Sequence, residues 1–186
     1  RRRALVVLDD RGAVHAGTGS GGSFEWSVTA VASIVTLLLG DRFEVHLYLS
    51  SDESGRVVPV DGVDQALDRL AAVQPTAATS ARGIVEALDD FSQHGGGLVV
   101  AVLGSLDETS AELCAARASH GLALVVSGGA TDPTTGGLVE VGPAAGPAVR
   151  TSEQLALGGW RTRTVRPGDR LQPLWEQLTA GRMVRS

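Results

Sequence analysis

The fold is decided by the stretch Ala4-Leu5-Val6-Val7-Leu8-Asp9-Asp10, in which five consecutive apolar residues end at two acidic ones. A short continuous apolar run of this kind is typical of a central strand buried on both faces of a sheet. Similar runs occur at Leu98–Leu103 and Leu122–Val126, and more polar strands are expected at residues 43–49 and Arg161–Val165. The sequence therefore predicts a largely parallel sheet.

Helical patterns separate these strands. The longest has apolar residues at steps of four, three, four and three, which places them on one stripe of a helix: Phe24, Val28, Val31, Val35 and Leu38. We expect Ser23 to cap this helix and Gly40 to end it. Further helices are expected over residues 63–70, 84–91, 105–119, 151–158 and 171–178.

The alternation of strands and helices predicts a three-layer α/β fold over residues 1–186, with a doubly wound sheet of about six strands. Residues 57–60 are expected to form a short antiparallel edge strand, because Pro59 cannot donate a hydrogen bond to a sheet. The Gly-, Pro- and Thr-rich residues 128–147 are expected to form an exposed loop that could contain a small hairpin. We expect one domain, because a single core commonly serves about 200 residues.

Composition limits the classes of function. Hydrophobic residues make up 43% of the 186 residues, enough for a full core, and the net charge is −5. An acidic chain is not expected to bind nucleic acid. All 16 basic residues are Arg, so a phosphate-binding P-loop, which requires Lys, is excluded. The single cysteine, Cys114, lies in a helical pattern and is expected to be an inert core thiol in a reducing compartment.

From the beginning of the sequence we expect a piece of a longer protein. The sequence begins Arg1-Arg2-Arg3 without a methionine and without the apolar stretch of a signal peptide. No apolar run reaches the roughly 18 residues that a membrane-spanning helix needs, because Thr and Ser residues interrupt residues 28–39. We therefore expect a soluble domain excised from a longer chain.

Candidate functional residues lie where the strands end. The carboxyl ends of parallel strands meet at one edge, where such sheets bind their ligands. This places residues 9–13, 50–52 and 104–107 around a single edge, which we call the carboxyl rim. Within it, Ser105-Leu106-Asp107-Glu108 matches a capping box, with Ser105 as the expected N-cap of the next helix.

The element order, the acidic end of the first strand and the segment Ala77-Ala78-Thr79-Ser80-Ala81 together resemble the von Willebrand factor A fold. The segments 4–11 and Ser23-Phe24-Glu25-Trp26 are more closely similar to the bacterial family catalogued as domain of unknown function fifty-eight. The resemblance implies a cytoplasmic domain of a protein anchored by upstream transmembrane helices. It also implies association with a MoxR-type AAA ATPase.

In the family that the chain resembles, a metal-ion-dependent adhesion site uses an Asp-x-Ser-x-Ser turn, a Thr and a later Asp. Mg²⁺ prefers such carboxylate and hydroxyl oxygens. Asp9 and Thr79 match the first Asp and the Thr, but Arg11 and Ala13 stand where the two Ser would be. Gly104 and Ser105 stand where the later Asp would be. We therefore expect a degenerate site with Asp9 and Thr79 as vestiges and no resident cofactor.

Other readings of these residues remain open. Asp10 could serve as a substitute ligand if Mg²⁺ were bound. The two acidic residues could also cap backbone N–H groups and mark the turn, and Arg11 could pair with one of their carboxylates.

Two enzyme readings compete with a binding function. Gly17-Thr18-Gly19-Ser20-Gly21-Gly22 satisfies the pattern of a dinucleotide fingerprint between a strand and a helix. However, the fingerprint normally follows its strand at once, and here residues 10–16 intervene, which favours a flexible loop. No Ser lies in a nucleophile elbow, and the four His residues have no metal-ligand spacing. Only His15 lies near the rim, and we expect it to be exposed.

The sequence therefore predicts a protein-binding module without catalytic residues. The expected partner-binding rim consists of Asp9, Asp10, Arg11, Thr79 and Ser105. The alternative is a nucleotide- or dinucleotide-binding enzyme that uses the 17–22 loop.

Overall fold

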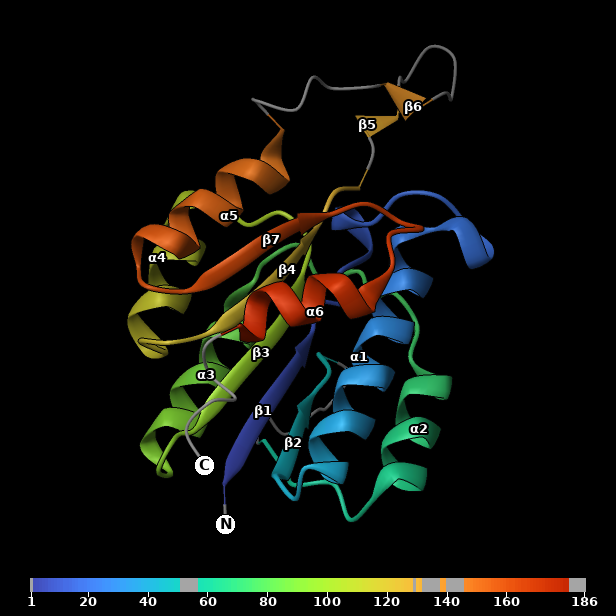
Figure 1. Ribbon diagram of the computed structural model, residues 1–186. Coiled ribbons are helices and arrows are strands. Elements are labelled where there is room, and N and C mark those ends of the chain that lie inside the picture. Colours follow the sequence, from blue (N-terminus) through green and yellow to red (C-terminus); the bar gives the residue numbers. More distant parts are fainter. Residues whose placement is uncertain (1, 51–56, 129, 132–137, 140–145, 181–186) are drawn as a thin grey trace.

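A five-stranded parallel sheet forms the centre of the computed structural model, which describes residues 2–50, 57–128, 130–131, 138–139 and 146–180 (Figure 1). The strands are β1 (Arg3–Leu8), β2 (Glu44–Tyr48), β3 (Leu98–Leu103), β4 (Leu122–Val126) and β7 (Arg161–Val165). Their order across the sheet is β2-β1-β3-β4-β7, and each neighbouring pair is parallel. The predicted limits of β3, β4 and β7 are confirmed.

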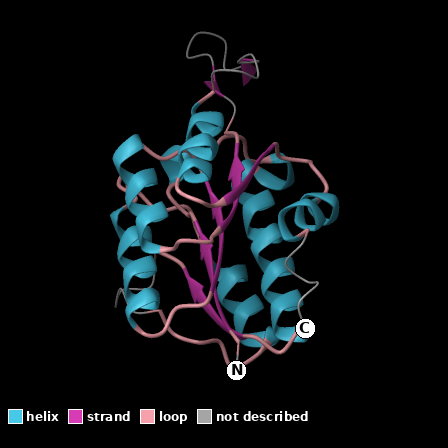
Figure 2. Cartoon of the chain, turned by 60° about the vertical axis from the view of Figure 1, so that its left-hand side comes forward, coloured by secondary structure: helices cyan, strands magenta, loops and turns pink. Residues whose placement is uncertain are grey.

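Helices cover both faces of the sheet (Figures 1 and 2). One face packs against α1 (Ser23–Gly40), α2 (Val63–Ala72) and α6 (Leu171–Thr179). The other packs against α3 (Arg82–Gln93), α4 (Glu108–Arg117) and α5 (Pro147–Leu157). The chain is thus a three-layer α/β protein, as the alternation of strands and helices predicts.

Strand β1 explains why the sequence begins with an unbroken apolar run. Side chains alternate between the two faces of a strand, so Ala4, Val6 and Leu8 pack under α1 while Leu5 and Val7 pack under α3. All five are fully buried. Because β1 lies between β2 and β3, the residues that follow Leu8 enter the middle of the carboxyl rim.

Contrary to the expectation from the sequence, helix α1, with 18 residues, is long and apolar enough, by length and composition alone, to cross a membrane. The fold gives it another role. It buries one side on β1, β2 and β3, with Phe24, Val31, Ile34, Val35 and Leu38 in the core. The same length and composition therefore serve a core helix here.

The predicted antiparallel edge strand is reduced to an isolated bridge. His46 and Pro59 form a single antiparallel bridge, and the Val60 N–H donates to the Val45 carbonyl at 2.8 Å. The segment runs beside β2 as expected, but Pro59 has no N–H to extend the ladder. The described residues therefore form a sheet of five strands and not six.

Two predicted helix caps are wrong. The helix α1 begins at Ser23 with Gly22 as the N-cap, because the Ser23 hydroxyl accepts a hydrogen bond from the Ala16 N–H at 2.9 Å instead. The helix α4 begins at Glu108, and its N-cap is Asp107, whose carboxylate accepts from the Ser110 N–H at 2.9 Å. The start of α1 thus has no side-chain cap, and the start of α4 is capped two residues later than expected.

The region after β4 contains the predicted hairpin, and the helix that follows it begins earlier than expected. A two-stranded antiparallel pair, β5 (Ala130–Thr131) and β6 (Leu138–Val139), lies within the expected loop and projects beyond the carboxyl rim (Figure 1). The small hairpin is thus confirmed, and the rest of residues 129–145 lies outside the described residues. The helix α5 begins earlier than expected because Pro147 occupies its first turn, where a missing N–H costs nothing.

Candidate functional site

The carboxylate of Asp9 lies at the centre of the rim and is 1% exposed. One oxygen, Oδ1, accepts from Nε of Arg11 at 2.9 Å and from the Arg11 backbone N–H at 3.3 Å. The other, Oδ2, accepts from an Nη2 of Arg11 at 2.8 Å and from the Gly104 N–H at 2.9 Å. Four donors thus satisfy both oxygens, and the Gly104 bond fastens the end of β1 to the end of β3.

Arg11 supplies the cation of the site from within the chain. Its side chain is 6% exposed and pairs with Asp9 through two parallel hydrogen bonds, the arrangement for which a guanidinium is best suited. It also donates to the Ser105 carbonyl at 3.1 Å. Burial lowers the pKa of the guanidinium, but the hydrogen bond and charge of Asp9 outweigh this, and the pKa lies above its ordinary value. The guanidinium is therefore held in its charged form.

Asp10 turns the other way and binds the end of β2. Its carboxylate accepts from the Ser50 N–H at 3.1 Å and from the Ser50 hydroxyl. Burial is the largest influence on the pKa of Asp10 and raises it, and the nearby charge of Asp9 adds to the rise, while the Ser50 hydrogen bonds partly offset it. The two neighbouring carboxylates thus differ: a cation neutralises Asp9, whereas the side-chain donors to Asp10 among the described residues are neutral.

The loop before α3 is fastened to the same place through Thr76. Its N–H donates to the Asp10 carbonyl at 2.7 Å, and its carbonyl accepts from the Gly12 N–H at 2.8 Å. Arg11 and Thr76 form an isolated parallel bridge. The rim therefore joins β1, β2, β3 and this loop in one network.

The structure brings together most of the predicted rim. Asp9, Asp10 and Arg11 are buried in it, and Ser105 joins it through its carbonyl. Thr79 is exposed, and no hydrogen bond of the described residues links it to the network. Thr76 occupies the place that was expected for Thr79. Nothing in the local sequence signals Thr76, because its partners, the backbone of residues 10 and 12 and the Ser50 hydroxyl, lie far away along the chain.

The donor set at the rim does not fit a magnesium ion. Both Asp9 oxygens already accept from the Arg11 guanidinium and from backbone N–H groups. A second cation would also lie beside a buried positive charge. Among the described residues, no group of three acidic, His or Cys side chains could hold a metal. Of the alternatives that the sequence left open, the structure shows the one in which Arg11 pairs with a rim carboxylate.

His15 is half-buried, whereas the sequence predicted that it would be exposed. One ring nitrogen, Nε2, lies 2.6 Å from the Asp9 carbonyl oxygen, and Nδ1 lies 3.0 Å from the Ser23 hydroxyl. A Ser beside a His at the start of a helix resembles a nucleophile and its base. However, Ser23 is completely buried and its oxygen accepts from the Ala16 N–H. We therefore infer that His15 and Ser23 have a structural role: their hydrogen bonds hold the loop between β1 and α1 in place.

The glycines of the 17–22 loop have a structural explanation. The backbone of Gly17 approaches that of Gly22 so closely that a Cβ on either would lie 3.0–3.2 Å from the other. Gly17 and Gly19 have positive φ angles of 77° and 64°, which favour glycine. A tight loop thus accounts for three of these glycines without a bound phosphate.

Cys114 lies under the rim and is completely buried. Burial raises the pKa of its thiol to about 12, and the charge of Asp9 adds to the rise. A thiol with this pKa is protonated at neutral pH and is a poor nucleophile. The expectation of an inert core thiol is consistent with this position.

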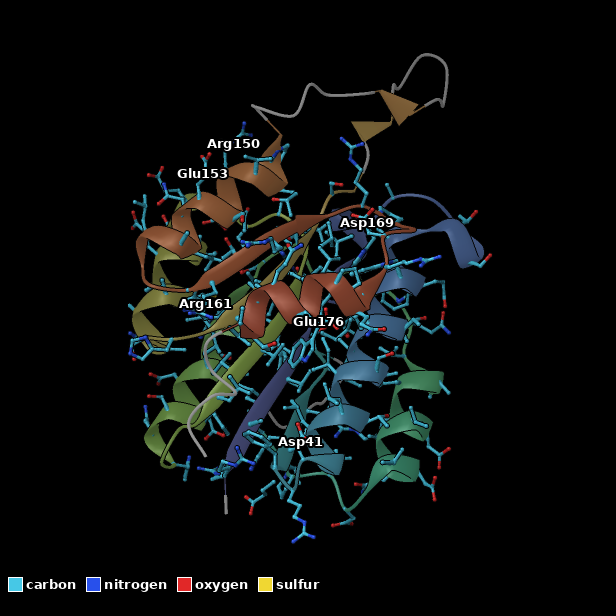
Figure 3. The ribbon with its side chains drawn as sticks, viewed as in Figure 1. Asp41, Arg150, Glu153, Arg161, Asp169 and Glu176 are labelled. Atoms are coloured by element: carbon cyan, nitrogen blue, oxygen red, sulfur yellow. The ribbon has the colours of Figure 1, made fainter. Side chains whose placement is uncertain are left out.

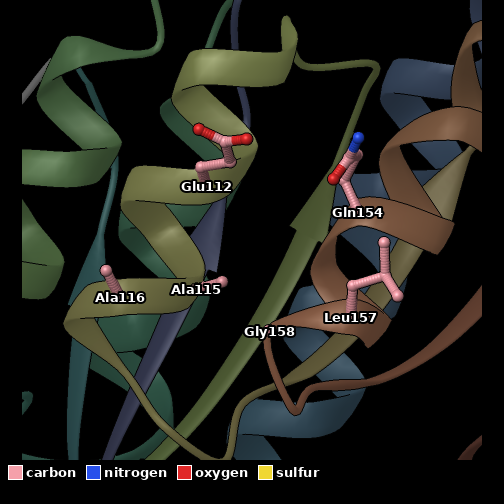
Figure 4. A pocket seen from close by; sticks show the side chains of 6 residues that line it. All are labelled: Glu112, Ala115, Ala116, Gln154, Leu157 and Gly158. Atoms are coloured by element: carbon pink, nitrogen blue, oxygen red, sulfur yellow. The ribbon is translucent and has the colours of Figure 1, made fainter.

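A hollow on the surface lies far from the rim. It opens between α4 and α5 near the ends of both helices, close to the beginning of β7 (Figure 4). It is lined by Glu112, Ala115, Ala116, Gln154, Leu157 and Gly158. Glu112 is the only ionisable side chain among them, so the hollow lacks the paired groups that acid–base or nucleophilic chemistry requires.

The chain matches no protein-family model, and it matches no curated protein. The likeness to the von Willebrand factor A fold stays a prediction from the residues quoted above.

Proposed function

We propose that the chain is a non-catalytic protein-binding module, and that its partner binds over the carboxyl rim. The observation that carries this proposal is the closed Asp9–Arg11 pair, in which a cation of the chain itself matches the buried charge of Asp9. Because the network fastens three strands and a loop, it would hold the surface above it in one shape. A preorganised surface loses little conformational freedom when it binds.

The buried side chains of Asp9, Asp10 and Arg11 would support this surface from below. Partner contacts would then fall on exposed neighbours, such as Ala13 in the short 3₁₀ turn after β1, Thr79 and Asp107, with the half-buried Ser105 between them. This refines the predicted rim by separating the residues that shape it from those that a partner could touch.

The family resemblance extends the proposal. We propose a von Willebrand factor A-like sheet with a degenerate metal site, in the cytoplasmic part of a membrane-anchored protein, with a MoxR-type AAA ATPase as the partner. These points are supported by the quoted segments and by the match of Asp9 to the first position of the family's motif.

The test compares two exposed alanines at opposite ends of the sheet. Ala13 lies on the rim, while Ala156 lies near the end of α5, close to the beginning of β7. We expect Ala13→Arg to weaken binding to a purified MoxR-type AAA ATPase about tenfold or more, because a long charged side chain would obstruct the interface. Ala156→Arg should bind as the wild type does in biolayer interferometry. Equal binding by both variants would contradict the proposal.

Calorimetry with NAD and ATP tests the alternative enzyme. Micromolar nucleotide binding that Gly19→Val abolishes would favour that alternative and overturn the binding-module proposal. No observation of the structure favours it at present, because the close approach of Gly17 and Gly22 explains the loop.

A further inference from the structure

The two outer edges of the sheet differ in how far another segment covers them. The outer edge of β2 is covered in part by the 57–60 segment, through the His46–Pro59 bridge and the Val60 hydrogen bond to Val45. At the other side of the sheet, β7 pairs with β4 and with no other strand of the described residues. Strand edges present rows of unpaired backbone groups that can accept another strand.

The hydrogen bonds to β4 show which groups of β7 turn outward. The Arg161 N–H donates to the Gly121 carbonyl at 3.0 Å, and the Val165 carbonyl accepts from the Ser127 N–H at 2.8 Å. Successive residues of a strand direct their backbone groups to opposite sides. Thr162 and Thr164 therefore direct their N–H and C=O groups away from β4, to the outer edge. Thr164 is exposed.

This edge carries a concentration of positive charge in an acidic protein. Residues 161–170 contain four arginines and one aspartate, whereas the whole chain has a net charge of −5. The arginines are Arg161, Arg163, Arg166 and Arg170, and all are exposed. In the part of the chain that the structure describes, none of the four forms an ion pair with an acidic side chain.

The partners of these arginines are neutral and replaceable. Arg161 donates to the Leu178 carbonyl at 3.2 Å, and Arg163 donates to Oε1 of Gln177 at 3.1 Å and to the Thr162 carbonyl at 2.8 Å. Figure 3 shows Arg161 at the beginning of β7, between α5 with Glu153 and α6 with Glu176. These two acids belong to the flanking helices, so the strand itself remains basic.

We propose that the outer edge of β7 binds an extended, acidic segment of a partner protein, which adds a strand to the sheet. The outward N–H and C=O groups of Thr164 would pair with the backbone of the added segment, and the arginines would select acidic side chains. Arg163 would release the Thr162 carbonyl and turn to a carboxylate, a stronger acceptor. This surface lies on the outer side of β7, beyond β3 and β4 from the Asp9–Arg11 pair, and the proposal does not depend on the function proposed for the rim.

The same charges argue against a second copy of this chain as the occupant. Pairing β7 with another β7 would set arginines against arginines, and like charges directly opposite each other destabilise a strand pair. Nucleic acid would satisfy the arginines but has no peptide backbone to pair with Thr164. An acidic peptide satisfies both the charges and the backbone groups.

The test uses a fluorescein-labelled octapeptide of alternating Glu and Val, with alternating Lys and Val as the control peptide, in fluorescence anisotropy. We expect the acidic peptide to bind with an affinity that falls as salt is added, and the basic peptide not to bind. The variant Thr164→Pro removes an outward N–H and breaks no bond to β4, so it should fold and bind about tenfold more weakly or worse. The matched variant Thr164→Val keeps the N–H and should bind as the wild type does.

Two further measurements keep the result independent of folding. The double variant Arg163→Glu, Arg166→Glu should lose binding of the acidic peptide without a change to the backbone. In the wild type, the acidic peptide should slow hydrogen exchange at the Thr164 amide in NMR spectra.

The proposal is overturned if the acidic peptide does not bind, or if folded Thr164→Pro binds it as well as Thr164→Val does. It is also overturned if the wild type self-associates and Thr164→Pro abolishes this, which would make a second copy the occupant. An oligothymidine that displaces the peptide and binds Thr164→Pro equally well would point to nucleic acid instead.

Discussion

The two ends of β1 carry the same kind of ion pair in different surroundings. At the carboxyl end, the side chains of Arg11 and Asp9 are 6% and 0% exposed and lie 2.8 Å apart. At the amino end, those of Arg3 and Glu44 are 24% and 37% exposed and lie 3.4 Å apart. The buried pair is complete, with every carboxylate lone pair used, whereas water can replace either partner of the outer pair. Burial, and not the presence of an ion pair, should therefore decide how much each end contributes to stability.

The largest effect is expected when the buried pair is broken from one side. Arg11→Met replaces the apolar stem of Arg11 with another apolar chain but removes the guanidinium. The Asp9 carboxylate is then buried without its cation. We expect a loss of about 3–5 kcal/mol in the free energy of unfolding, measured by urea denaturation. Arg3→Met at the amino end should cost much less. Equal losses in the two variants would show that burial does not distinguish the pairs.

A double variant tests the cause of this loss by also removing the charge of Asp9. Asp9→Asn retains an oxygen that can accept from the Gly104 N–H, and with Arg11→Met no buried charge is left. We expect the double variant to recover about 1–3 kcal/mol of the loss seen with Arg11→Met alone. No recovery would indicate that the packing of the Arg11 stem, and not the charge of Asp9, caused the loss.

The contrast between the two ends also shows what the sequence could reveal. The limits of β3 and β4 follow from unbroken apolar runs, because a strand buried on both faces tolerates little else. The meeting of residues after β1, β2 and β3 follows from chain order in a parallel sheet. An ion pair between Arg11 and a rim carboxylate was among the open alternatives, since two acids and a base stood together at a strand end.

The details that the sequence could not reveal depend on competition between distant groups. Ser23 was expected to cap α1, but its hydroxyl accepts a hydrogen bond from the Ala16 N–H instead. Thr79 was expected at the rim, but the backbone of Thr76 reaches Asp10 instead. Spacing along the chain does not show which of several nearby polar groups forms a given hydrogen bond, because this depends on the conformation of the loop.

A smaller effect is expected from Asp10, whose pKa is raised above its ordinary value of 3.8, chiefly by burial. A carboxyl with a raised pKa stabilises the fold below pH 3.8 and loses this contribution as the pH rises through its pKa in the folded state. We therefore expect the free energy of unfolding of Asp10→Asn, relative to that of the wild type, to rise with pH over this window. Urea denaturation at a series of pH values measures the difference.

Ser50→Ala provides the matched control for Asp10. The Ser50 hydroxyl donates to the Asp10 carboxylate and lowers its pKa. Without it the pKa of Asp10 should rise further, and the decline in stability should extend to higher pH. A flat difference between Asp10→Asn and the wild type at every pH would contradict the raised pKa.

The smallest effect is expected at the amino end, and it has the opposite sign. The pKa of Glu44 is lowered, chiefly by its hydrogen bond with His46, and the charges of His46 and Arg3 lower it further, while burial is the second-largest influence and opposes them. A lowered pKa stabilises the fold above the ordinary value of 4.5, and this contribution is lost as the pH falls. The difference between Glu44→Gln and the wild type should therefore be complete above pH 4.5 and disappear as the pH falls through the lower pKa of Glu44 in the folded state, and added salt should reduce it because the pair is open to solvent. If salt left this difference unchanged, the outer pair would be behaving like the buried one. The contrast between the two ends of β1 would then need a cause other than access to water.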